Sequence, residues 1–135
     1  MFPIGDDNHG ARGIPLVTIG LIVVNVLVYL YEAMLSLPDL QRFIYTYGAI
    51  PAEIERGIDL YTLFTSMFVH GGFAHVAGNM LFLWIFGDNI EQRFGPILYL
   101  LFYVGTGLAA SAAHILTDPT SLVPTVGASG AISGV

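Results

Sequence analysis

The sequence predicts an all-α fold, a polytopic bundle of membrane-spanning helices. Of its 135 residues, 55% are hydrophobic and only 10% are charged, whereas about 25% of residues are charged in ordinary soluble domains. Long uncharged stretches also recur along the chain, separated by short segments that carry Asp, Glu or Arg. Since about 20 apolar residues in a helix cross a hydrocarbon core roughly 30 Å thick, we expect these stretches to lie in a lipid bilayer.

The first predicted span covers residues 14–35, which are rich in Leu, Ile and Val. Residues 1–13 precede it as an N-terminal leader. The leader carries Asp6 and Asp7 against a single Arg12, whereas a cleaved signal peptide begins with positive charge. We therefore expect the first span to be retained.

The region after the first span, residues 36–59, mixes charged residues, prolines and aromatic residues. Aromatic side chains favour the headgroup level of a bilayer, and short amphipathic helices lie in the same plane. This composition predicts a long interfacial loop with short helical pieces.

Two further spans and the start of a fourth follow. A His-Gly-Gly break at residues 70–72 precedes the second span at 73–86, and acids and an arginine at 88–93 indicate a tight polar turn. The third span covers 97–117 and begins after Pro96, which a first helical turn tolerates. A short loop at 118–124 then leads to a fourth helix starting at residue 129. Only seven residues remain from there, so the sequence predicts a chain truncated within its fourth transmembrane helix.

The charge pattern narrows the possible functions. The chain has four basic residues against ten acids, so no basic face for a nucleic acid is expected. It has no cysteine, which excludes disulfides, thiolate metal sites and a cysteine nucleophile. The four arginines divide equally between the two sides of the predicted bundle, and the positive-inside rule therefore does not fix the orientation.

His75 and Asn79 are the first candidate site residues. They are four positions apart in the second span, so they share one face of the helix. Polar side chains at membrane depth are costly and commonly face a bundle interior or a water-filled cavity. The alternative is that both residues hydrogen-bond neighbouring helices and only hold the bundle together.

A second candidate is Ser129 in the segment Gly127-Ala128-Ser129-Gly130. A serine flanked by glycines at the start of a helix has an accessible hydroxyl and nearby backbone amides, as a nucleophile and an oxyanion pocket require. Gly130 and Gly134 also form a pair of small residues four apart, which allows close helix packing. The two interpretations are compatible.

Together and in this order, the motifs resemble the rhomboid family of intramembrane serine proteases. The resemblance covers residues 14–135, nearly the whole chain. Four segments carry it: His70-x4-His75-x3-Asn79, Gly127-x-Ser129-Gly130, Glu91-x-Arg93-x-Gly95 and Tyr47-Gly48-Ala49-Ile50-Pro51.

The resemblance implies a role for each matched residue. Ser129 would be the catalytic nucleophile, and the side chains of His75 and Asn79, with the backbone amide of Ser129, would stabilise the oxyanion. His70, Gly127 and Gly130 would be structural motif residues. The family's general base is a histidine on its sixth span, which lies beyond residue 135, and His114 matches no catalytic position.

The resemblance further implies transmembrane protein substrates, no cofactor, no metal, and a multi-pass location that we expect to be a prokaryotic plasma membrane. A second chain that supplies the remaining helices is a candidate partner. We expect this chain alone to be inactive and its full-length parent to be an enzyme.

Three other functions compete with this interpretation. A non-catalytic rhomboid-like pseudoprotease that binds transmembrane segments would share most of these motifs. A zinc protease is disfavoured because His70 and His75 lack the His-Glu-x-x-His pattern. A channel or transporter is disfavoured by the scarcity of charged residues within the spans.

Overall fold

The computed structural model describes residues 13–135, so all but the last residue of the predicted leader lies outside the described part. Between residues 13 and 135 the regular elements are all helices, together with one isolated bridge between Ala49 and Thr125. The predicted all-α fold is confirmed. The helices are α1 (Leu16–Met34), α2 (Leu37–Tyr47), α3 (Pro51–Ile54), α4 (Thr62–Thr65), α5 (Phe73–Phe94), α6 (Pro96–Thr117) and α7 (Ser129–Ile132).

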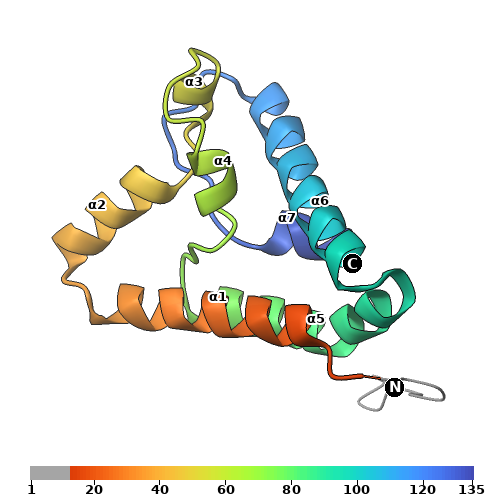
Figure 1. The fold of residues 1–135 in the computed structure, drawn as a ribbon. Coiled ribbons are helices and arrows are strands. Elements are labelled where there is room, and N and C mark those ends of the chain that lie inside the picture. The colour runs from red at the N-terminus through yellow and green to blue at the C-terminus, as the bar shows by residue number, and fades with distance from the viewer. Residues whose placement is uncertain (1–12) are drawn as a thin grey trace.

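The three long helices define the shape of the molecule (Figure 1). Helices α1 and α5 lie side by side, and α6 leaves the end of α5 at a steep angle. The segment with α2, α3 and α4 forms the other side of the resulting triangle, and α4 lies inside it. The chain then returns from the far end of α6, so that α7 packs against α6 and also contacts α5.

The burial pattern of α1 is the reverse of that in a soluble protein. Its buried residues lie along one face and are mostly polar: Thr18, Leu21, Asn25 and Glu32. Its exposed face carries large apolar side chains, for example Leu27, which is 60% exposed. Helices α1 and α6 are both long and apolar enough to cross a membrane. Apolar side chains outside and polar ones inside are what a bundle in lipid requires.

Helix α5 is longer than the predicted second span. It continues to Phe94, so the polar turn expected at 88–93 is wrong. The reason is that the most buried charge of this segment, Glu91, is fully hydrogen-bonded and does not need to face water. The chain turns instead at Gly95, whose φ of +82° suits glycine.

The partner of Glu91 is the first turn of α1. Its carboxylate accepts hydrogen bonds from Val17 N (2.9 Å), Thr18 N (2.8 Å) and Thr18 Oγ1 (2.8 Å). The first amides of a helix have no partner within the helix and must be satisfied from elsewhere. Glu91 therefore caps α1 from the last turn of α5.

Small residues bring the last segment close to α6. A Cβ atom added to Gly130 would lie 2.6 Å from Ala110 Cβ, and one added to Gly134 would lie 2.7 Å from Thr106 Cβ. Gly130 and Gly134 thus face Ala110 and Thr106 of α6, and the two residues of each pair are four positions apart. Backbones can approach this closely only where the side chains are small.

Candidate active site

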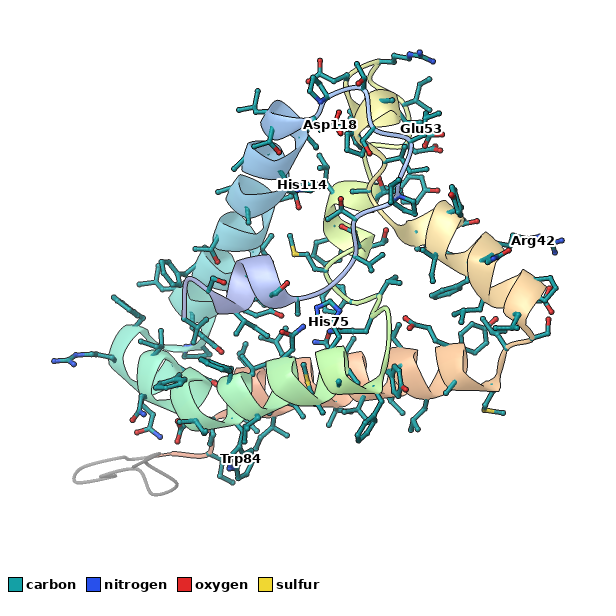
Figure 2. All side chains as sticks on the ribbon, turned by 180° about the vertical axis from the view of Figure 1, so that it is seen from behind. Arg42, Glu53, His75, Trp84, His114 and Asp118 are labelled. Atoms are coloured by element: carbon teal, nitrogen blue, oxygen red, sulfur yellow. The ribbon has the colours of Figure 1, made fainter. Side chains whose placement is uncertain are left out.

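A cavity of about 600 Å³ lies between α5 and α7. Its polar lining includes His75, Asn79 and Ser129, so the structure brings these three predicted site residues together around one space. Figure 2 shows His75 pointing from α5 toward the segment that leads into α7, whereas Trp84 points away from the opposite side of the same helix. The remaining walls are mainly apolar, with Phe82 and Phe86 among them.

Ser129 is the first residue of α7, and its side chain is exposed to the cavity. The segment before it is held by backbone links, among them the Ala49–Thr125 bridge and a hydrogen bond from Gly127 N to Ser66 O (2.8 Å). After it, Ser133 Oγ donates to the carbonyl oxygen of Ser129 at 2.6 Å. The position of the hydroxyl is thus determined by loop contacts on one side and a helical turn on the other.

Gly127 contacts the imidazole of His75. A Cβ atom added at Gly127 would lie 2.7 Å from His75 Nε2, closer than a side chain can approach. Its φ of +116° is also a conformation that residues with a Cβ rarely adopt. The sequence position therefore needs glycine both for the shape of the loop and for the proximity of His75.

Asn79 is held by His70. Asn79 Nδ2 lies 3.0 Å from His70 Nε2, and His70 Nδ1 lies 3.1 Å from Phe68 O. These contacts fit one tautomer, in which Nδ1–H donates to the carbonyl of Phe68 and Nε2 accepts from the Asn79 amide. The amide has a second hydrogen, which can be donated into the cavity that Asn79 lines.

His70 itself is only 2% exposed and does not line this cavity. Burial lowers the pKa of His70 below its usual value of 6.5; the hydrogen bond to Phe68 O opposes this effect, and the adjacent His75 adds to it. The two imidazoles pack edge to face with ring centroids 5.2 Å apart. A neutral His70 is the form that can accept the Asn79 hydrogen bond.

His114 lies elsewhere. It is exposed on α6, and with Ser129 it borders a second, smaller cavity of about 180 Å³. It is not among the residues that line the cavity with His75 and Asn79. Within residues 13–135, no hydrogen bond joins the hydroxyl of Ser129 to a histidine, and so these residues present no assembled serine–histidine pair.

Sequence reasoning missed Glu32. This residue is 2% exposed, and its two carboxyl oxygens lie 3.2 and 3.3 Å from His70 N. It falls inside the predicted first span, residues 14–35. The available signal was that it is the only charged residue of that apolar stretch, and an ionisable residue within a span is a functional candidate by default.

The fold and the site together define a class of protein: a helical membrane protein with a serine, a histidine and an asparagine around one cavity. Comparison with known families shows which family this is. The model of the Rhomboid domain matches residues 58–135, more than half of the chain. The chain therefore belongs to the rhomboid family, whose members are integral membrane proteins and are generally intramembrane serine proteases.

Curated relatives come from a plant and from bacteria. RHOMBOID-like protein 5 of Arabidopsis thaliana is 34% identical over 100 residues, which are 74% of this chain and 31% of that protein. Rhomboid protease GluP of Bacillus subtilis is 35% identical over 88 residues, 65% of this chain and 17% of its own length. Rhomboid protease AarA of Providencia stuartii is 28% identical over 149 aligned positions, 99% of this chain and 53% of its own length.

The chain thus spans between about a sixth and just over half of these three relatives. No solved structure matches it.

Proposed function

We propose that the rhomboid domain to which these residues belong is an intramembrane serine endopeptidase that cleaves transmembrane helices. The observation that carries this proposal is the placement of Ser129, His75 and Asn79 around a single cavity. The two relatives named as rhomboid proteases support the same activity. The substrate class, transmembrane proteins in the lipid bilayer, is part of this proposal and is supported by the generally intramembrane activity of the family.

In this proposal the Ser129 hydroxyl attacks the carbonyl carbon of a peptide bond. The hydroxyl proton passes to a general base and then to the departing amine, and water later hydrolyses the acyl-enzyme. The negative charge on the carbonyl oxygen is stabilised by the amide of Asn79, the imidazole of His75 and the backbone N–H of Ser129. One such donor contributes about 2.7–4 kcal/mol to the transition state.

The general base is a histidine outside these residues, supplied by further helices of the same protein or by a second chain. His70 accepts from Asn79 and packs against His75, so it serves structure. His114 and Ser129 both border the smaller cavity, but no hydrogen bond joins their side chains within residues 13–135, and His114 matches no catalytic position of the family. The location we propose is a prokaryotic plasma membrane. The relatives include bacterial proteins as well as plant ones.

The test is labelling with a fluorophosphonate probe, which reacts with activated serines. The complete protein is reconstituted in proteoliposomes as wild type, Ser129→Ala and Ser133→Ala. Ser133 is the matched control because it lines the same cavity and is also a serine, and the backbone hydrogen bond from Ser133 N to Ser129 O (2.9 Å) keeps the helical turn when its hydroxyl is removed. We expect labelling of the wild type and Ser133→Ala and none of Ser129→Ala. Equal labelling of all three would show that Ser129 is not the nucleophile, and an unlabelled protein that still binds transmembrane segments would indicate the pseudoprotease function.

A further inference from the structure

Glu32 is a buried carboxyl group in an unfavourable place. It lies in the last turn of α1 and is 2% exposed. Removing a carboxylate from water is costly, and the C-terminal end of a helix carries partial negative charge, which repels another negative group. A residue with these costs requires a compensating contact.

The compensating contact is the backbone of His70. Both carboxyl oxygens of Glu32 lie within 3.3 Å of His70 N. His70 comes directly before Gly71 and Gly72, and a Cβ atom added to either glycine would meet nothing within 4 Å. Glycine has the largest conformational freedom, so this segment has little rigidity of its own, and the Glu32 contact anchors it to α1.

From His70 the contacts continue to the cavity. The ring of His70 accepts from the amide of Asn79 at 3.0 Å, and it packs against the ring of His75 at 5.2 Å between centroids. Both Asn79 and His75 line the cavity that also contains Ser129. A displacement of His70 would therefore change the orientation of both side-chain donors.

We propose that Glu32 is a positioning residue of the oxyanion pocket, acting through His70 on Asn79 and His75. It does not line the cavity and touches no reacting atom. This inference rests on the proposed protease function. It also predicts which property of Glu32 matters: an oxygen acceptor at the end of a side chain of this length, facing His70 N.

The experiment compares substitutions of Glu32 in the complete protein in proteoliposomes. Glu32→Gln keeps an acceptor oxygen at the same reach, Glu32→Leu removes it, and Glu32→Asp keeps the carboxylate but shortens the reach. Asn25→Leu is the matched control, since Asn25 is also a buried polar residue of α1, but its amide donates to Leu21 O of the same helix at 2.7 Å and it makes no hydrogen bond to the segment that holds His70. The measurement is the rate of fluorophosphonate labelling as a function of probe concentration, per folded protein.

For Glu32→Leu we expect the limiting labelling rate to fall at least about tenfold, the size seen when a partner that orients a functional side chain is lost. The half-saturating probe concentration should change less than about twofold, because the lost interaction acts in the transition state. Glu32→Gln should retain most of the rate, and Asn25→Leu should lose stability but not rate. If Glu32→Leu does not fold, the rate of Glu32→Gln should still exceed that of Glu32→Asp.

Two results would overturn the inference while leaving the proposed function intact: labelling of Glu32→Leu at the wild-type rate, or a rate for Glu32→Asp that equals or exceeds that of Glu32→Gln. A wild type labelled no better than Ser129→Ala would reject the proposed function, and the inference with it.

Discussion

Substitution of Gly127 by alanine adds a single methyl group, but it should strongly reduce the reactivity of the candidate active site. Gly127 has a φ of +116°, and a Cβ atom there would lie 2.7 Å from His75 Nε2. Holding a residue other than glycine in such a conformation costs about 1–3 kcal/mol. Because the backbone of Gly127 is fixed by its hydrogen bond to Ser66 O, the imidazole of His75 is the group that must move.

The expected loss of activity follows from the proposed role of His75. Removal of one donor to an oxyanion reduces the rate by about 10²–10³-fold, and a displaced imidazole should approach this value. The assay measures fluorophosphonate labelling of Ser129 and, in parallel, the free energy of unfolding in detergent. Gly127→Ala should lower the labelling rate by about two orders of magnitude while losing only a few kcal/mol of stability.

Gly57→Ala is the matched control. Gly57 also has a positive φ, +72°, but a Cβ atom there would meet nothing within 4 Å. We expect a loss of about 1–2 kcal/mol in stability from the left-handed conformation and no change in labelling. If Gly127→Ala and Gly57→Ala reduced labelling equally, the contact between Gly127 and His75 would have no role in the chemistry, and our assignment of His75 would be wrong.

Three further results are expected. Glu91→Ala should lower the free energy of unfolding by at least about 3 kcal/mol, since each hydrogen bond to a charged group contributes about 1.5–3 kcal/mol. In the same unfolding assay, Arg93→Ala should change it by no more than about 0.5 kcal/mol, because Arg93 is exposed. The contribution of His70, measured as the difference in unfolding free energy between wild type and His70→Gln, should fall as the pH drops below about 6.5. It should level off below the lowered pKa of folded His70, because the unfolded state binds the proton first. The 135-residue chain alone should not be labelled at Ser129, but it should be labelled when a second polypeptide supplies the remaining helices. Labelling of the chain alone that Ser129→Ala abolishes would show that a general base lies within these residues.

The helical spans were predictable because lipid imposes a simple rule on composition. The structure has α1 at Leu16–Met34 and α6 at Pro96–Thr117, within two residues of the predicted ends, since each stretch is predominantly apolar and is flanked by polar residues. The short helices of the first loop were predicted in kind but not in position. Their boundaries depend on tertiary contacts, such as the hydrogen bond from Thr65 Oγ1 to Tyr47 O (2.8 Å), that no local pattern encodes.

The site was predictable in part. The four-residue spacing of His75 and Asn79 places them on one helix face, and the glycines around Ser129 indicate a tight loop. That this loop would return to α5 could not be deduced from spacing and came only from the family resemblance. The acids and arginine at 88–93 predict a polar turn, whereas Glu91 is buried within α5; Glu32 falls inside the predicted first span, and nothing in the local pattern indicates its contact with His70.

These two carboxyl groups have equivalent positions in the fold. Helices α1 and α5 are antiparallel neighbours, and each contributes a glutamate from its last turn to backbone amides at or just before the start of the other. In water the first amides of a helix can be solvated, but in lipid they need partners within the protein. For Glu91 a carboxylate suits this task, because its two oxygens accept three donors and its charge is stabilised near the N-terminal end of α1. At one end of the helix pair the contact caps α1, and at the other end the same kind of contact holds His70, which in turn binds Asn79. The requirement to satisfy backbone amides in a membrane thus connects α1, through Glu32 and His70, to Asn79 in the candidate active site.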